Sequence, residues 1–502
     1  MKIYNSIAAW IIKKRINDIN LAIKFPHKIQ ENLRNKLIKN GENTAFGIQY
    51  NFKDIQSRKD FVTEIPLTDY NDLFPLIKRM RSGEQNVLWP TKIKWFAKSS
   101  GTENNRSKYI PISQESIKDC HYKGGKDLLS LYCNYFPMKK IFEGKTLVLG
   151  GSRSVSSLSN HIYEGDISAI IIDNLPFWVR FQQSPSKKNS LISDWEKKID
   201  LMVDQSINEN VTSFSGVPSW VIVFANKVLE KTGKSNLHQV WPDFELYMHG
   251  GIEFSPFRKY FDKLFPNGIN YLETYNASEG FFAVQDIPGK EGMLLMIDSG
   301  IYYEFLLLKD LNNSESNTLS LHQVKLDEDY ALVISTNSGL WRYLIGDTIR
   351  FTCLSPYRII VTGRTKHFLN SFGEELMVHN ANQALKIACL KTKSELIDYT
   401  ASIKYTSTKM NACHEWLIEF AIVPKSLEFF TNIFDKALME LNSDYEAKRF
   451  KCLILQKPIV HIARKGLFYN WMKQKGKLGG QNKVPRLFDD RIYLDELLEM
   501  NM

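Results

Sequence analysis

Phe96-Ala-Lys-Ser-Ser-Gly-Thr-Glu-Asn-Asn-Arg-Ser-Lys108 is a polar loop between two short apolar segments, Ile93–Ala97 and Tyr109–Ile112. The apolar flanks predict two strands joined by this loop. Phosphate oxygens accept hydrogen bonds and carry negative charge, so free amides, hydroxyls and cations suit a polyphosphate. An ordinary polar turn has a similar composition, and the loop by itself leaves both interpretations open. Its candidate phosphate ligands are Ser99, Ser100, Gly101, Thr102 and Lys108.

The length and composition indicate a multidomain globular protein. At 502 residues, the chain is expected to form two or more domains. Its 43% hydrophobic and 24% charged residues are ordinary for such a protein. The net charge of +10 would suit an anionic substrate, a nucleic acid or a membrane surface. The cations are scattered and no nucleic-acid-reading motif occurs, so a solvated basic surface is favoured and no nucleic-acid partner is expected.

Cysteine spacing and hydropathy favour the cytoplasm. The six cysteines are far apart and form no Cys-x-x-Cys pair, which argues against a disulfide framework and a zinc site. The apolar run Ile7–Ile12 is too short for a signal peptide. No stretch approaches the roughly 20 apolar residues that span a bilayer. We therefore expect a cytoplasmic protein without a membrane partner; the sequence does not indicate its oligomeric state.

The hydrophobic pattern predicts a change of architecture near residue 365. Residues 1–364 are expected to form a large domain and residues 365–502 a small one, with a hinge at 363–370. In the large domain we expect helices over 6–80 and 191–232, strands at Lys145–Gly151, Ala169–Asp173 and Phe244–His249, and many strands over 293–362. In the small domain we expect strands near 401–406, 416–423 and 453–460, and helices near 426–441 and 466–474.

The segment Tyr271–Gly280 combines an aromatic, a hydroxyl and an acid at the end of an apolar strand. Tyr275 could flank a base, and Ser278 could reach a phosphate. Glu279 is a hard oxygen ligand of the kind Mg²⁺ uses while it bridges phosphates. Alternatively, Glu279 simply caps a turn before Gly280, and this segment alone favours that simpler interpretation.

Two glycine-containing turns offer further nucleotide contacts. Asp347 follows a glycine at a strand end, where an ionised carboxylate can accept hydrogen bonds from both ribose hydroxyls. Gly250 and Gly251 would let a flat base approach the backbone closely. Ordinary turns and strand ends carry the same residues, so each signal is weak in isolation.

Lys483 lies in the glycine-rich segment Gly479–Arg486. A lysine on such a loop can place a point charge on a phosphoryl group during transfer. A solvated surface lysine is the alternative. Other nucleotide-binding and nucleophile motifs are absent from the sequence. Gly144-Lys145-Thr146 resembles the end of a P-loop, but Lys139 occupies the position where a P-loop needs glycine. No dinucleotide-binding fingerprint or nucleophile elbow occurs.

The order of these motifs is more specific than any one of them. It resembles the adenylate-forming superfamily of acyl-CoA synthetases, nonribosomal adenylation domains and luciferases. Within it, the chain most resembles the Gretchen-Hagen-three family of acyl-acid amido synthetases, particularly its bacterial branch. Further segments carry the resemblance: Thr44–Gly47, Gly216–Trp220, His249–Gly251, Gly363–Glu375, His414–Phe420 and Lys483–Arg486.

The resemblance implies an α/β, adenylate-forming fold of two domains. The large N-terminal domain would contain mixed sheets and a β-rich subdomain, and the small α+β domain would act as a lid. Residue by residue, the resemblance implies that the nucleotide is held by Ser99, Ser100, Gly101 and Thr102 at the phosphates, by Gly250, Gly251 and Tyr275 at the adenine, and by Asp347 at the ribose. It also implies that Glu279 binds Mg²⁺, that Arg364 acts at the hinge and that Lys483 is catalytic. The acid pocket would lie near Gly216, Val217 and Pro218 and segment 120–135. One departure is Glu103–Lys108, where the plant pattern continues Ser-x-Gly-Lys.

The activity implied by the resemblance is ATP-dependent activation of a carboxylic acid as an acyl-adenylate, followed by transfer to an amine, for which an amino acid is expected. The expected partners are thus ATP, Mg²⁺ and two small molecules. An acyl-CoA ligase and a nucleotide-binding regulatory protein without chemistry are the alternatives. The sequence identifies neither the acid nor the amine.

Overall fold

The computed structural model describes residues 14–502 with short gaps, and Ser100, Gly101 and Thr102 lie outside the described residues. The gaps are 100–107, 138–140, 150–161, 176, 187–188, 190–191, 193, 252–253, 255–256, 312, 314–316, 366–367, 370–373, 375, 406–411, 450–454, 479–482 and 489.

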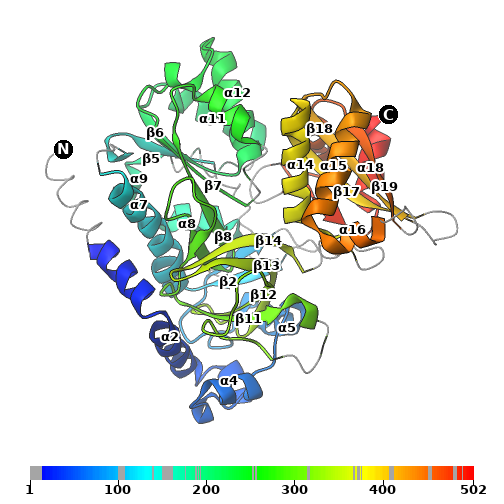
Figure 1. The fold of residues 1–502 in the computed structure, drawn as a ribbon. Helices are drawn as coiled ribbons and strands as arrows, with labels where there is room; N and C mark the ends of the chain where they lie inside the picture. The colour runs from blue at the N-terminus through cyan, green and yellow to red at the C-terminus, as the bar shows by residue number, and fades with distance from the viewer. Residues whose placement is uncertain are drawn as a thin grey trace.

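An 11-stranded mixed sheet forms the centre of the large domain (Figure 1). One part is parallel and places its strands side by side in the order β5, β3, β6, β7 and β8. Parallel strands are usually buried on both faces, and the helices α11, α12 and α13 supply apolar side chains to the core here. The bounds are β3 Lys145–Val148, β5 Gln183–Ser184, β6 Val211–Ser215, β7 Leu246–Gly250, β8 Asn270–Ala277, α11 Trp195–Ser206, α12 Pro218–Thr232 and α13 Arg258–Leu264.

The other part of the sheet is antiparallel and corresponds to the predicted β-rich region. It begins where β9 pairs antiparallel with β8, and it continues through β10, β14, β13 and β12 to β11. The expected strands over 293–362 are therefore confirmed. Their bounds are β9 Gly280–Val284, β10 Met293–Leu295, β11 Ile301–Leu307, β12 Asp329–Thr336, β13 Tyr343–Leu354 and β14 Tyr357–Arg364.

A separate three-stranded sheet contains the two strands predicted around the polar loop. β1 (Trp95–Ser99) and β2 (Lys108–Ile112) pair antiparallel, with Ser99 opposite Lys108, and β4 (Tyr163–Gly165) pairs parallel with β1. The hairpin is therefore as predicted. The helices before and after it are residues 14–24, α2 Pro26–Gly41, α3 Ala45–Gln49, η1 Phe52–Asp54, α4 Arg58–Glu64, α5 Tyr70–Arg81, α6 Gln114–Ser116, η2 Ile117–Tyr122, α7 Lys123–Tyr135, η3 Ile141–Glu143 and α9 Phe177–Arg180.

Two predictions in this domain were wrong. The expected strand Ala169–Asp173 lies instead within helix α8, Ile167–Asn174. Short apolar runs suit a buried helix as well as a buried strand, and α8 buries Ile167 and Ile170 in the main core beside β1. The expected helical region 191–232 is interrupted by β6, whose Val211–Ser215 pairs with strands on both sides.

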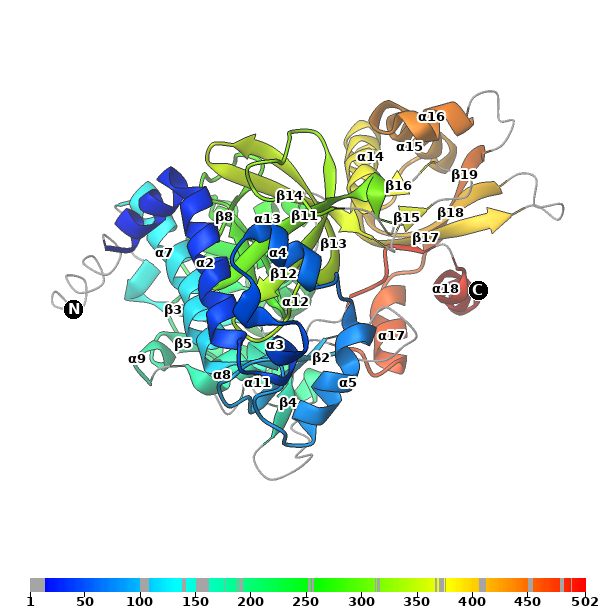
Figure 2. The ribbon, with the colours of Figure 1, turned by 90° about the horizontal axis from the view of Figure 1, so that it is seen from below.

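The C-terminal residues form a smaller α+β domain around a four-stranded sheet ordered β19-β18-β17-β20. Figure 2 shows α14 and α15 on one side of this sheet and α18 on the other. The expected strands and helices here are confirmed to within a few residues, whereas the division at 364/365 remains a prediction. The bounds are β15 Phe368–Leu369, β16 Leu376–Met377, α14 Val378–Thr392, β17 Glu395–Tyr405, β18 Ala412–Ile422, α15 Leu427–Leu441, α16 Ser443–Arg449, β19 Leu455–Ala463, α17 Leu467–Gln474, β20 Leu487–Phe488 and α18 Ile492–Asn501.

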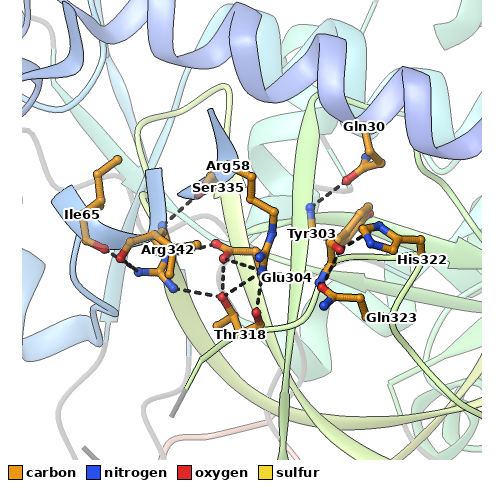
Figure 3. Close-up of polar contacts among 12 residues, drawn as sticks. Gln30, Arg58, Ile65, Tyr303, Glu304, Thr318, His322, Gln323, Ser335 and Arg342 are labelled. Atoms are coloured by element: carbon orange, nitrogen blue, oxygen red, sulfur yellow. Dashed lines mark hydrogen bonds and ion pairs between the residues drawn. The ribbon is translucent and has the colours of Figure 1, made fainter. Parts of the chain in front are cut away.

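A buried polar network fastens the N-terminal helices to the antiparallel strands (Figure 3). Arg342 and Glu304 are almost fully buried, and Arg342 Nε lies 3.1 Å from Glu304 Oε2. The Arg342 guanidinium also donates to the carbonyl of Ile65 at 2.5 Å and to Thr318 Oγ1 at 3.0 Å. Because both charges are paired and hydrogen-bonded, their burial is compatible with a stable core.

We predict that Arg342→Met lowers the free energy of unfolding of the large domain by about 3–5 kcal/mol, because the buried Glu304 would lose its close ion-pair partner and keep only Arg58, whose Nη2 lies 3.9 Å from Glu304 Oε1. Urea unfolding followed by tryptophan fluorescence measures the change. Arg350→Met is the matched control, since Arg350 on β13 pairs with Asp329 on the neighbouring strand β12 of the same antiparallel region but is 32% exposed. We expect about 1 kcal/mol or less there; equal losses in the two variants would contradict the role of burial.

Candidate functional site

Three of the predicted site segments follow neighbouring parallel strands. Gly216–Pro218 follows β6, Gly250–Gly251 ends β7, and Tyr275–Glu279 ends β8 and begins the turn into β9. The carboxyl ends of parallel strands meet at one edge of a sheet, where α/β proteins commonly bind ligands. The topology therefore brings these segments together, although up to about 60 residues of sequence separate them.

An open cleft of about 300 Å³ lies at this edge, between the large and the small domain. Side chains and backbone from both domains line it, which requires the small domain to lie against the large one as it does here. Residues predicted from the sequence make up much of the lining: Lys108, Gly251, Tyr275, Ser278, Glu279, Asp347, Arg364 and Lys483.

Asp347 connects three elements at the wall of the cleft, and it lies within β13 rather than at the strand end that the sequence predicted. The antiparallel register of β13 and β14 places it opposite Arg364, and Arg364 Nε lies 3.0 Å from Asp347 Oδ1. The hydroxyl of Tyr275, on β8, donates to Asp347 Oδ2 at 2.7 Å. Each carboxylate oxygen can accept two hydrogen bonds, so both retain capacity for a further donor such as a ribose hydroxyl.

The Asp347 carboxylate contributes to raising the pKa values of both of its partners, Arg364 and Tyr275. The nearby Asp347 carboxylate raises the pKa of Arg364, and so the guanidinium stays protonated. Burial, followed by the Asp347 charge, raises the pKa of Tyr275 well above its ordinary value. Tyr275 is therefore a neutral hydrogen-bond donor at physiological pH.

Glu279 lies in the turn between β8 and β9 and is only 9% exposed. Burial raises the pKa of its carboxyl, whereas the charge of Lys108 acts in the opposite direction. Within the described ranges, no group of three or more histidine, cysteine or acidic side chains could hold a metal ion by itself. A single cleft-facing carboxylate nevertheless fits Mg²⁺, which commonly takes one or two protein carboxylates together with substrate phosphates and water.

Lys483 reaches from the small domain into the cleft. Its Nζ donates to the backbone carbonyl of Gly251 at 2.5 Å. The side chain is accessible from the open cleft, but protein atoms surround the ammonium. This burial, together with the charge of Arg364, lowers the pKa of Lys483 to about 8.

The two glycines at the end of β7 have different structural roles. A Cβ at Gly250 would lie 2.3 Å from the Thr274 carbonyl on the adjacent strand β8, so no larger residue fits. Gly251 has φ of +82°, and a Cβ there would lie 2.9 Å from Lys483 Nζ. Close packing and backbone conformation therefore require glycine at both positions.

Not every predicted residue lines the cleft. Gly250 lies in the strand beneath it, and Gly216, Val217 and Pro218 lie beside it rather than in its wall. Val217 approaches the cleft most closely, with its Cγ2 3.7 Å from a Cβ position at Gly251. Ser99 ends β1 opposite the cleft-lining Lys108, and the roles of the remaining loop residues stay predictions.

The small domain contributes cleft residues that the sequence did not reveal. His379 and Asn382 lie on the first turns of α14, and Tyr399 lies on β17. The Tyr399 hydroxyl donates to Asn382 Oδ1 at 2.7 Å, which fixes both side chains at the rim. These residues occur in no recognisable motif, and no helix was predicted from the sequence at the position of α14.

The cleft contains both signs of charge. Lys108, Arg364 and Lys483 supply cations, and Asp347 and Glu279 supply carboxylates. The cations suit a polyanion, and the acids suit sugar hydroxyls and a divalent cation. A nucleoside triphosphate with its metal ion combines all of these groups.

No helix in the described parts of the chain has the length and apolar character needed to cross a membrane.

Comparison with curated proteins found indole-3-acetic acid-amido synthetase GH3.3 of Arabidopsis thaliana, 21% identical over 540 residues that cover 91% of this chain and 89% of that protein. Jasmonoyl-L-amino acid synthetase JAR4 of Nicotiana attenuata is also 21% identical, covering 94% of this chain and 92% of its own.

Solved structures share the fold over nearly the whole length. The GH3.15 acyl acid amido synthetase in complex with 2,4-DB has a TM-score of 0.80 at 16% identity, covering 98% of this chain and 96% of that chain. A 2-hydroxyisobutyryl-CoA ligase in complex with an acyl-AMP has a TM-score of 0.61 at 13% identity, covering 94% and 91%. The predicted adenylate-forming architecture is therefore confirmed.

Three family descriptions match this chain in sequence order. Residues 15–269 match the GH3 family N-terminal domain, residues 294–364 its central domain and residues 379–492 its C-terminal domain. The first match alone covers more than half of the chain. The family expected from the sequence is thereby confirmed, while the assignment to a bacterial branch remains a prediction. The protein belongs to the GH3 family.

Proposed function

We propose that this protein is an acyl-acid amido synthetase that activates a carboxylic acid with ATP and transfers the acyl group to the amine of an amino acid. The ligase class expected from the sequence agrees with the relatives, which are named amido synthetases. The observation that carries the proposal is the convergence of Asp347, Glu279 and Lys483 on one cleft, although more than 200 residues separate the outermost two.

In the first half-reaction, a carboxylate oxygen of the acid attacks the α-phosphorus of ATP. The bond from that phosphorus to the bridging oxygen breaks, so the products are an acyl-adenylate and pyrophosphate. Negative charge accumulates on the α-phosphate oxygens in the transition state. Lys483 supplies a cation for them, while Asp347 and Tyr275 hold the ribose and base.

Other residues support this step. We assign Ser99, Ser100, Gly101, Thr102, Lys108 and Ser278 to the phosphates, and Gly250 and Gly251 to the adenine. Glu279 would hold Mg²⁺, which when bound supplies charge neutralisation to the phosphates. Arg364 holds Asp347 in position through the 3.0 Å contact of its Nε with Asp347 Oδ1. The acid would occupy the region near Gly216, Val217 and Pro218.

In the second half-reaction, the amine nitrogen attacks the acyl carbon of the adenylate. The bond from that carbon to the phosphate oxygen breaks, so an amide and AMP are released and the nitrogen loses a proton. No protein nucleophile is needed. Lys483 would then withdraw with the small domain, because its position in the cleft suits the adenylation step.

ATP–pyrophosphate exchange tests the proposal. The purified protein would be assayed with aromatic, indolic and fatty acids, and mass spectrometry would follow with mixed amino acids and coenzyme A. Amides support the proposal, whereas acyl-CoA products would establish the alternative ligase. ATP binding without exchange for any acid would favour a regulatory protein.

We place the protein in the cytoplasm, since the five described cysteines are free thiols.

We predict that Lys483→Ala lowers ATP–pyrophosphate exchange by about 100- to 1,000-fold, because one transition-state charge contact is lost. Amide formation from a supplied acyl-adenylate should remain within about threefold of the unmodified protein. Lys436→Ala, which changes an exposed lysine on α15, is the control. Equal loss of both half-reactions in Lys483→Ala would refute the assigned role.

The pH dependence should also reflect Lys483. Its pKa is lowered to about 8 in the free cleft, so the ammonium is present below that pH and lost as the pH rises through it. We therefore predict that kcat/KM for ATP falls above about pH 8, while kcat falls only at higher pH because bound triphosphate favours the charged form. In Lys483→Arg the guanidinium stays protonated, so the falling limb should disappear; its persistence would point to another group.

Glu279→Gln tests the metal role. The substitution keeps the shape but removes the charge, so we predict that the Mg²⁺ concentration for half-maximal exchange rises by about tenfold or more. A magnesium titration of the exchange rate measures it. Glu440→Gln, at an exposed position on α15, should leave that concentration unchanged. An unaltered magnesium requirement in Glu279→Gln would exclude Glu279 as a ligand.

A further inference from the structure

Two ion pairs connect the large and small domains outside the cleft. Lys473 Nζ, on α17, lies 2.6 Å from Glu196 Oε1, on α11. Lys263 Nζ, on α13, lies 2.8 Å from both carboxylate oxygens of Glu395, at the start of β17. Both pairs therefore join an element of the large domain to an element of the small one.

The contact of Lys473 is part of a complementary helix pairing. Glu196 lies in the first turn of α11, which Asp194 caps, and Lys473 lies in the last turn of α17. Glu196, and more weakly Asp194, raise the pKa of Lys473. Acids at the beginning of one helix thus face a cation at the end of another, as both helix dipoles favour.

Aromatic contacts reinforce this helix pairing. The Tyr469 hydroxyl on α17 lies 3.5 Å from Glu196 Oε1, and its ring centroid is 6.5 Å from that of Trp220 on α12. Leu467, Phe468 and Trp471 of α17 belong to the same buried cluster as Trp195 and Trp220 of the large domain. The ion pair thus lies at the edge of an apolar interdomain contact.

We propose that Glu196–Lys473 and Lys263–Glu395 form an interdomain latch that holds Lys483 in the cleft and so favours adenylation over acyl transfer. This inference rests on the proposed two-step function. The four side chains are positioning residues, since none of them lines the cleft or contacts the reacting groups. Two separate attachments also resist rotation of the small domain better than one would.

Exposed ion pairs of this kind contribute little to the stability of a fold. A domain rearrangement, however, is an equilibrium between two folded states, and small differences between them alter the populations directly. An exposed pair typically changes such an equilibrium by about two- to fivefold, and reversing one charge adds repulsion. The latch would thus be weak enough to open during each catalytic cycle.

Charge reversal and charge exchange test the latch. Lys473→Glu should lower the exchange rate about five- to tenfold, because Glu196, Asp194 and the new acid repel one another. Amide formation from a supplied acyl-adenylate should be unchanged or faster. The exchanged pair Glu196→Lys with Lys473→Glu should recover part of the exchange rate, because the ion pair is restored although both helix dipoles then oppose it. A merely structural loss would not allow this recovery.

Lys227→Glu is the matched control. Lys227 on α12 pairs with Asp200 on α11 at 2.5 Å, so it makes the same kind of ion pair one turn from Glu196 but within the large domain. The exchange rate of this variant should stay within twofold of the unmodified protein. An equal drop in Lys227→Glu and Lys473→Glu would overturn the proposal, as would failure of the exchanged pair to recover activity.

Small-angle X-ray scattering of the protein without nucleotide gives a readout independent of chemistry. Lys473→Glu should increase the radius of gyration, and the exchanged pair should restore it. If no acid supports exchange but the radius changes as expected, the latch stands and the proposed function fails. An unchanged radius in Lys473→Glu would overturn the latch, whatever the activity.

Discussion

The carboxylate of Asp347 holds the candidate site together. It accepts from Tyr275 on β8 and pairs with Arg364 at the end of β14, so one side chain joins the parallel part of the sheet to the antiparallel part. The register that places Asp347 opposite Arg364 is a backbone property of the β13–β14 ladder. The geometry of the cleft wall consequently depends on strand pairing more than on any flexible side chain.

The same residues lie directly before the change from large to small domain. Arg364 is the last residue of β14, and Thr365 donates its backbone N–H to the Gly346 carbonyl at 2.9 Å. The beginning of the predicted hinge is thus fastened to β13, the strand that contains Asp347. In the proposed function, the small domain would move about residues after this point, so the domain motion and the proposed ribose contact of Asp347 would not disturb one another.

Local sequence patterns correctly predicted the elements whose secondary structure does not depend on tertiary packing. The amphipathic helix Leu427–Leu441 and the hairpin around residues 99–108 follow from periodicity and turn composition. Ala169–Asp173 was mistaken for a strand because its isoleucines suit either structure, and packing beside β1 decided the outcome. The motif residues could be named in advance, but their meeting in one cleft depends on sheet order. His379 and Tyr399 could not be found, since only the docking of the small domain brings them to the site.

Gly250 is a position of this fold that accepts no larger side chain, whereas the region around Val217 is not restricted in this way. Its Cα faces the Thr274 carbonyl so closely that even a methyl group would push β7 and β8 apart. Those two strands support Gly251 and Tyr275, so any such separation would distort the lining of the cleft. The region around Val217 lies beyond this constriction and is not subject to it. Under the proposed function, ordinary substitutions near Val217 could therefore adapt the acid pocket to new acids, while the proposed ATP-binding half of the site stays unaltered.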